Sequence, residues 1–114
     1  MTEEKEEFFP SIITSLPEAD LSIEGVNAYV FQGTGQQIVF MSFSRNVEIP
    51  AHEHKDQWAV VLSGEIELTI GSETKTYRKG DTYHIPEGVT HSASIKNGYS
   101  DVSLFNQKDR FNIK

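Results

Sequence analysis

Short strand-like runs separated by turn residues dominate the chain from Leu21 onward and constrain its fold more than any other feature. The runs are rich in β-branched and aromatic residues, and no stretch keeps a helical period. Glycine, proline or asparagine lies at the breaks, as in Gly80 and Asn97-Gly98. The expected strands are 27–32, 36–43, 57–62, 65–70, 74–78, 82–85, 91–95 and 101–106. This spacing predicts an all-β sandwich or barrel and leaves no place for a parallel βαβ unit.

Two of these runs indicate how the sheets are covered. Residues 65–70 alternate strictly, with Ile66, Leu68 and Ile70 on one face, which predicts a half-exposed strand. Residues 36–43 are apolar on both faces, so this strand is either central or covered by the N-terminal segment or a second subunit. A homodimer is expected because closed two-fold pairs are the commonest oligomers.

The length of 114 residues fits one domain, for which we expect an N-terminal extension over 1–20 and a barrel over 21–110. Residues 8–16 could form a short helix or a strand. The net charge of −7 argues against a nucleic-acid partner, because phosphates are bound through clusters of lysine and arginine. The absence of cysteine excludes thiolate ligands. Without a secretory leader or a membrane-length apolar run, a cytoplasmic protein with no membrane partner is expected.

The pair His52 and His54 is the first candidate for chemistry. A spacing of two on an extended chain sends both imidazoles to the same face, where one cation can bind both. A pair of this kind taken alone is more often a surface feature of a polar loop. The segment 80–91 strengthens the metal interpretation, because it contains two tight turns and ends on His91, which a folded-back strand could carry to the same face.

Both segments resemble sequence motifs of the cupin superfamily. The string from His52 to Gly64 is similar to the first motif, which has two histidines one residue apart, an acidic residue and a closing glycine. Gln57 stands in the acidic position, after a gap of two residues from His54 that is shorter than is usual in the family. The opening glycine of the motif is replaced by Asn46.

The second cupin motif is matched by Gly80, Pro86, Gly88 and His91. Ile95 stands where an asparagine often lies in the family. The likeness covers about residues 36–106, and two ordered motifs are much more specific than either alone. The resemblance implies the cupin fold, a double-stranded β-helix or jelly-roll barrel.

By their positions in these motifs, His52, His54 and His91 are expected to be metal ligands. Gln57 is either a fourth ligand through its amide oxygen, a hydrogen-bond partner of a metal-bound water, or no part of the site. A glutamine ligand would leave the site one unit more positive than a glutamate would, which favours an anionic substrate oxygen. The ligands suit one divalent transition metal, Mn, Fe, Ni, Cu or Zn, without choosing among them.

Asp56 and Glu53 are rival carboxylates near the histidines. Strict alternation places Asp56 on the face of His52 and His54, whereas a turn at 55–56 would give the inward position to Gln57. The fixed distance from Gln57 to the closing glycine of the motif favours the second register. Glu53 points away from the metal in either register.

His84 is a candidate acid or base at the cavity mouth, together with Gln57, although a structural histidine is the commoner role for such a residue. Trp58 and Tyr83 are either aromatic walls of a pocket or residues of ordinary packing and dimer contacts, and we favour packing for both.

The resemblance implies a small metal-binding cupin that acts on a small oxygenated metabolite such as a sugar acid, by isomerase, lyase or oxygenase chemistry. Pectin-degradation cupins that open unsaturated uronates resemble this chain in size and in having a glutamine beside three histidines. A sugar acid requires a basic partner, and the only arginines are Arg45, Arg78 and Arg110. The alternative is a non-catalytic module that binds a small ligand or a metal, because a fold does not fix a reaction.

Overall fold

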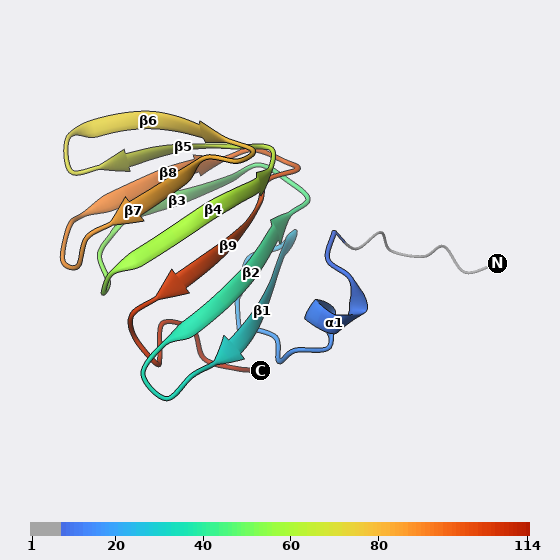
Figure 1. The fold of residues 1–114 in the computed structure, drawn as a ribbon. Helices are drawn as coiled ribbons and strands as arrows, with labels where there is room; N and C mark the ends of the chain where they lie inside the picture. The colour runs from blue at the N-terminus through green and yellow to red at the C-terminus, as the bar shows by residue number, and fades with distance from the viewer. Residues whose placement is uncertain (1–7) are drawn as a thin grey trace.

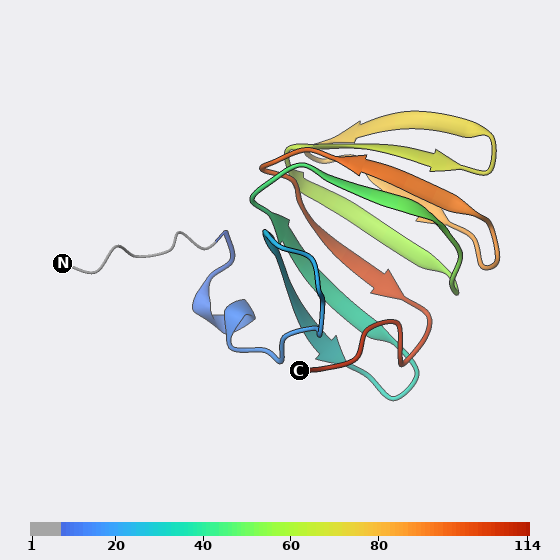
Figure 2. The ribbon, with the colours of Figure 1, turned by 180° about the vertical axis from the view of Figure 1, so that it is seen from behind.

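Nine strands and one short helix make up residues 8–114, the part of the chain that the computed structural model describes. The helix is α1 (Ser11–Thr14), and the strands are β1 (Val26–Gln32), β2 (Gln37–Phe43), β3 (Val47–His52), β4 (Gln57–Ser63), β5 (Glu65–Ile70), β6 (Glu73–Arg78), β7 (Thr82–Ile85), β8 (His91–Ile95) and β9 (Ser100–Phe105). They form a five-stranded sheet, in the order β1-β2-β9-β4-β7, and a four-stranded sheet, in the order β3-β8-β5-β6. The two antiparallel sheets face each other as walls of a barrel (Figures 1 and 2). The all-β jelly-roll architecture expected from the sequence is confirmed.

All eight strands expected from the sequence are present, each within one residue of its expected ends. The ninth strand, β3, is missing from that expectation. It contains Pro50, which interrupts a strand pattern because proline has no N–H for the ladder. β3 lies at the edge of its sheet, where a missing donor on the open side leaves the pairing with β8 intact.

The two apolar faces of β2 have separate explanations. β2 is central, between β1 and β9, so the prediction of a central strand is confirmed. Its outer face is also partly covered, because Phe9 of the N-terminal segment packs edge-on against Phe40 and Tyr29. For residues 8–16 the sequence left a helix and a strand open, and the structure has the short helix α1 there.

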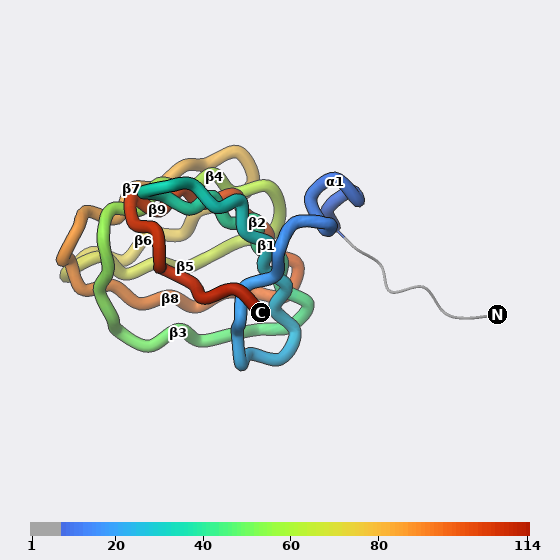
Figure 3. Tube along the Cα trace, turned by 90° about the horizontal axis from the view of Figure 1, so that it is seen from below, coloured from blue at the N-terminus to red at the C-terminus, as the bar shows by residue number. Residues whose placement is uncertain are grey.

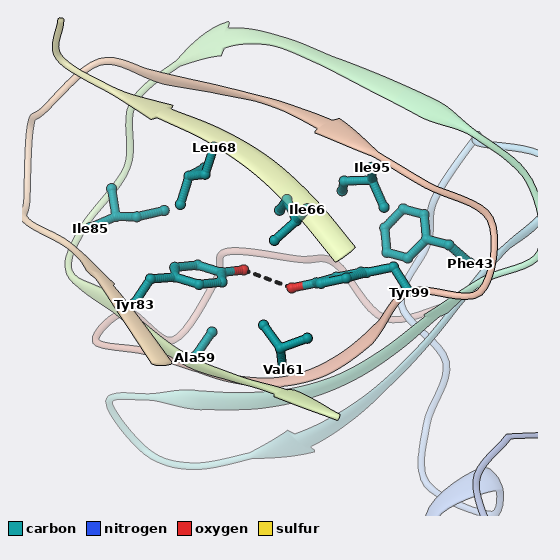
Figure 4. Packing of buried hydrophobic residues seen from close by; sticks show 9 residues of the cluster. All are labelled: Phe43, Ala59, Val61, Ile66, Leu68, Tyr83, Ile85, Ile95 and Tyr99. Atoms are coloured by element: carbon teal, nitrogen blue, oxygen red, sulfur yellow. Dashed lines mark hydrogen bonds between the residues drawn. The ribbon is translucent and has the colours of Figure 1, made fainter. Parts of the chain in front are cut away.

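Inward side chains of both sheets fill the space between the walls (Figure 4). The buried cluster consists of Phe43, Ala59, Val61, Ile66, Leu68, Tyr83, Ile85, Ile95 and Tyr99. Ile66 and Leu68 face this core while Glu67 is exposed, which confirms the half-exposed strand predicted for 65–70. Tyr83 packs in this cluster, as expected, and also forms part of the wall of the barrel cavity, the alternative considered for it.

Gly64 makes the tight turn between β4 and β5. Its φ is +68°, and a Cβ at this position would lie 2.7 Å from the backbone of Gly98 and Tyr99. Only glycine fits both the left-handed conformation and the close approach. This requirement explains why the distance from Gln57 to the closing glycine of the motif sets the register of β4.

The C-terminal segment after β9 crosses one end of the barrel (Figure 3). The buried side chain of Gln37 holds it there, because its Nε2 donates to the Phe111 carbonyl at 3.0 Å and its Oε1 accepts from the Phe111 N–H at 3.0 Å. The ring of Phe111 packs against Phe105 of β9. These contacts fix the place of Arg110, the residue before Phe111.

The outer face of the five-stranded sheet carries a transverse row of apolar side chains. Phe31, Ile38, Leu104 and Trp58 lie opposite one another on β1, β2, β9 and β4. Phe31 and Trp58 are about half exposed, so Trp58 does not pack in the core, and the dimer contact expected as part of its packing role stays a prediction. The row is a surface that a second copy could cover, and the homodimer stays a prediction. Among residues 8–114, no helix has the length and apolar character needed to cross a membrane.

Candidate metal centre

Three histidines from separate parts of the sequence meet at one end of the barrel. His52 ends β3, His54 lies in the following loop, and His91 begins β8 directly opposite His52. One ligand nitrogen from each side chain lies within 4.8 Å of the other two. The Nε2 atoms of His54 and His91 are 3.0 Å apart. The convergence expected from the two motifs is therefore present.

Backbone carbonyls orient all three rings. The Nδ1 atoms of His52, His54 and His91 lie 2.8, 2.7 and 3.0 Å from a carbonyl oxygen. These oxygens belong to Pro50, Lys55 and Val89. A carbonyl only accepts, so each Nδ1 carries the proton and each Nε2 carries a free lone pair in the neutral ring. This is the arrangement in which metal-binding histidines are usually held.

The surroundings favour the neutral form of His54 and His91. Burial lowers the pKa of His54 to about 4 and also lowers the pKa of His91. The nearby cation of Arg110 acts in the same direction on both rings. At neutral pH these two histidines are therefore in the unprotonated form that a metal requires.

Gln57 occupies the inward position at the start of β4. Its side chain is buried, and its Nε2 donates to the Ser103 hydroxyl at 3.1 Å. That hydroxyl donates in turn to Asp101 Oδ1 at 3.3 Å, so it accepts from the amide and does not donate to it. The amide oxygen of Gln57 is the side-chain atom left available to a ligand in the cavity.

The other sequence candidates lie outside the histidine cluster. Asp56 accepts from the Glu87 N–H at 2.7 Å and lies 3.3 Å from His84 Nε2. These two contacts lower the pKa of the Asp56 carboxyl. His84 is on the outer face of β7, between the inward Tyr83 and Ile85, and does not line the cavity. Its expected place at the cavity mouth is therefore wrong, because alternation along β7 turns its side chain outward.

Glu53, between the two histidines of the first motif, is exposed, as either register predicts. Together with the placement of Asp56 and Gln57, this identifies a turn at 55–56 that resets the alternation after β3.

One arginine reaches the site. Arg110 lines both the barrel cavity and a second hollow on the solvent side. His52 and His54 also line both of these spaces. Its guanidinium lies over the ring of Phe111, at 4.4 Å from the centroid. Among residues 8–114, its Nε is the single buried side-chain N or O atom without a hydrogen-bond partner. The other two arginines are elsewhere and pair with carboxylates, Arg45 with Glu24 and Arg78 with Glu65.

Sequence analysis missed a buried acid deeper in the barrel. Asp101 of β9 is 3% exposed and accepts from the hydroxyls of Tyr99 at 2.5 Å and Tyr83 at 3.3 Å. Burial raises the pKa of Asp101 to about 6, and the hydrogen bonds oppose part of that rise. Alternation along the strand could have indicated that Asp101 is buried. Asp101, Ser103 and Phe105 follow one another at intervals of two residues along β9 and share its inward face.

A cavity of about 340 Å³ extends from the histidines into the barrel. Its mouth carries the imidazoles and Arg110, and its interior carries Asp101 and the two tyrosines among apolar side chains. Metal–imidazole bonds of about 2.0–2.1 Å place neighbouring ligand nitrogens roughly 3 Å apart. The 3.0 Å separation of the His54 and His91 Nε2 atoms, and the His52 nitrogen within 4.8 Å of both side chains' ligand atoms, therefore fit a divalent transition metal.

Comparisons with known proteins agree with this geometry. A cupin domain model matches residues 39–105, more than half of the chain. Quercetin 2,3-dioxygenase of Bacillus subtilis is 38% identical over 58 residues, which are 49% of this chain and 17% of that protein, so this chain spans about a sixth of that relative.

Two solved structures cover nearly the whole chain. An RmlC-like cupin from Shewanella frigidimarina has a TM-score of 0.72 and 21% identity over 92% of this chain and 94% of its own. KdgF from Halomonas sp. has a TM-score of 0.70 and 19% identity over 92% and 97%. At this identity they share the fold, and the domain match decides the family. The chain belongs to the cupin domain family.

Proposed function

We propose that this cupin binds one divalent transition metal through the Nε2 atoms of His52, His54 and His91 and holds a small oxygenated metabolite at that centre. A metal in such a site supplies a Lewis acid for an oxygen atom of the metabolite or a binding position for O2. The proposal includes isomerase, lyase and oxygenase chemistry, because the fold does not select among them.

The contact between His54 and His91 carries the proposal. Both Nδ1 atoms donate to carbonyls, so both Nε2 atoms present lone pairs to each other across 3.0 Å. No proton lies between two such acceptors unless one ring is charged, and burial lowers the pKa of both rings. A cation between them turns this repulsion into two coordination bonds.

Gln57 is proposed as a fourth ligand through its amide oxygen. The support is the direction of the hydrogen-bond chain, in which Asp101 accepts from Ser103 and Ser103 accepts from the Gln57 Nε2. A neutral ligand leaves the full double charge of the metal at the site, which favours an anionic oxygen in the metabolite.

Arg110 provides the second reason to expect an anion. Its guanidinium lies beside the histidines and forms no ion pair with any carboxylate of residues 8–114. Guanidinium groups bind carboxylates through paired hydrogen bonds, so we propose that a carboxylate of the metabolite lies between Arg110 and the metal. The similarity to a protein named as a quercetin dioxygenase supports a small oxygenated metabolite, and the carboxylate itself is proposed from Arg110.

Metal content tests the ligand assignment. After exposure to Zn²⁺ and removal of free metal, wild-type protein is expected to retain about one ion per chain, as a site of three imidazole ligands should. The double variant His52→Ala, His54→Ala is expected to retain little. Glu53→Ala is the matched control, because it changes the same loop at an exposed side chain and should keep the wild-type content. Equal metal content in the wild type and the double variant would refute the site.

A double-mutant cycle tests the fourth ligand. Ser103→Ala removes the partner of the Gln57 amide, and Gln57→Ala removes the amide itself. Ser103→Ala is expected to weaken Zn²⁺ binding about 10-fold, the usual size of an outer-shell effect. Gln57→Ala is expected to weaken it at least as much, because this variant removes the proposed ligand itself. If the serine acts through the glutamine, the double variant should bind no more weakly than Gln57→Ala. Full additivity of the two losses would show that Ser103 does not orient the ligand.

Turnover separates an enzyme from a binding module. Protein loaded with Mn²⁺, Fe²⁺ or Ni²⁺ would be assayed with hydroxy acids, sugar acids and diketones, with and without O2. Conversion that disappears in the His52→Ala, His54→Ala variant identifies an enzyme. Binding of these compounds without conversion would instead identify the non-catalytic module.

A further inference from the structure

We infer that the metabolite has two unlike ends: an anionic oxygen head at the histidines and Arg110, and an apolar body of about one ring or a short alkyl chain inside the barrel. This inference rests on the proposed function and narrows its metabolite to a class different from the sugar acids. The cavity walls, its internal hydrogen bonds and its length each support it.

The walls of the cavity behind the histidines are apolar. They include Met41, Ile49, Ile66, Leu68, Ile85 and Phe43. Most of these side chains belong to the buried core, and they come from both sheets (Figure 4). Burying an apolar group against such walls is favourable, whereas a hydroxyl placed there loses water and gains no partner.

The deep polar groups of the cavity are already satisfied by one another. Both carboxylate oxygens of Asp101 accept hydrogen bonds, from Tyr99 and Tyr83 on one side and from Ser103 on the other. The two tyrosine hydroxyls also contact each other at 3.0 Å. This network offers no spare donor for the several hydroxyls of a sugar acid. At the mouth, by contrast, the buried Nε of Arg110 has no hydrogen-bond partner among residues 8–114, and the imidazole Nε2 atoms and the Gln57 amide oxygen are available to a ligand.

The dimensions of the cavity limit the body. Phe105, whose ring lies 5.4 Å from that of His54, and Asp101 are four residues apart on β9. At about 3.3 Å per residue, the backbones of Phe105 and Asp101 are roughly 13 Å apart along the strand, while the Gln57 side chain spans part of that depth and reaches Asp101 through the Ser103 hydroxyl. The volume of about 340 Å³ is at the small end of ligand pockets. A chelating head with one ring or a short chain fits this space, and a larger fused system does not.

Three 2-hydroxy acids with the same head test the inference. Lactate carries a methyl body, 3-phenyllactate a benzyl body and gluconate a polyhydroxylated body. Their binding to Zn²⁺-loaded and metal-free protein would be measured by calorimetry. Phenyllactate is expected to bind the loaded protein about 10- to 100-fold more tightly than lactate, because each buried methylene-sized group adds several-fold. Gluconate is expected to bind no more tightly than lactate.

A cavity-filling variant tests whether the apolar body of the metabolite lies inside the barrel. Ala93 is an inward residue of β8 that lines the cavity, so Ala93→Leu adds volume there without removing a core contact. It should reduce the affinity for phenyllactate at least 10-fold and leave lactate within twofold. Ser94→Leu is the matched control on the outward face of the same strand, where the serine hydroxyl bonds Glu48, and it should leave both affinities unchanged.

The outcomes separate this inference from the proposal on which it rests. Gluconate binding as tightly as phenyllactate, phenyllactate binding no more tightly than lactate, or no binding of any probe would overturn the two-ended metabolite. If phenyllactate is preferred equally with and without Zn²⁺, the apolar body stands and the metal-held head is wrong. A response to Ser94→Leu equal to that of Ala93→Leu would place the body outside the cavity.

Discussion

The two ends of the barrel cavity use polar groups in opposite ways. At the deep end, Asp101 accepts hydrogen bonds from Tyr83, Tyr99 and Ser103, and the network is complete within the protein. At the mouth, the Nε2 atoms of two histidines present lone pairs to each other, and a buried nitrogen of Arg110 has no partner. The deep end completes its own hydrogen bonds, whereas the mouth needs a cation and an anion from outside.

This difference assigns the polar groups of the deep end to folding and those of the mouth to binding. Buried polar groups that satisfy one another contribute to the stability and uniqueness of the core. Polar groups left open at a cavity mouth cost stability and are retained where they bind something. Substitutions at the mouth should therefore change metal binding with little effect on folding, and substitutions at the deep end should do the reverse.

The largest expected effect is at the mouth. His91→Ala removes one of three imidazoles and should weaken Zn²⁺ binding more than about 100-fold, because a two-histidine site lacks the closed ligand set. Metal-free stability should fall by no more than about 1 kcal/mol, since the variant also removes the contact between two acceptors. Zn²⁺ titration and urea unfolding measure the two quantities. A large loss of stability with unchanged metal affinity would reverse the comparison.

The deep end should show its effect in the pH dependence of folding. Asp101 has a pKa of about 6 in the folded protein, above its ordinary value of 3.8. Its proton therefore stabilises the fold fully below about pH 4, and this contribution is lost as the pH rises through about 6. The loss amounts to about 3 kcal/mol at pH 7.

Asp101→Asn removes this titration. The difference in free energy of unfolding between metal-free wild type and the variant should therefore change by about 3 kcal/mol between pH 4 and pH 7, in favour of the variant at the higher pH. Urea unfolding at several pH values measures it. Parallel pH profiles for the two proteins would mean that Asp101 titrates normally and that the deep end is not closed to water.

The smallest effect is expected outside the cavity. His84 pairs with Asp56 on the outer face, and both side chains are about half exposed. Exposed pairs of this kind contribute at most about 1 kcal/mol. His84→Ala should therefore leave Zn²⁺ affinity within twofold and stability nearly unchanged. A loss of turnover in this variant alone would restore the acid–base role expected from the sequence.

The sequence predicts the mouth better than the deep end. Spacing on an extended chain and the glycine and proline turns determine where His52, His54 and His91 point, because these are local properties of the backbone. The inward position of Gln57 follows from its fixed distance to Gly64, whose turn admits no side chain.

Two features of the site depend on distant contacts: which of the three arginines reaches it, and which residues bind Asp101. Arg110 reaches the site because Gln37 holds the Phe111 backbone, a pairing between residues 74 positions apart. Asp101 meets Tyr83 only when β9 and β7 lie on either side of β4. Alternation indicates that Asp101 faces inward, but the partners that keep it there come from the tertiary fold.

X-ray absorption of the protein loaded with one equivalent of Zn²⁺ tests the central claim most directly. We expect three imidazole nitrogens at about 2.0–2.1 Å, with the outer-ring scattering typical of histidine, because one nitrogen of each of the three histidines lies within 4.8 Å of the other two. The same measurement on His54→Ala should show two. A first shell made of oxygen ligands, with one imidazole or none, would contradict the account.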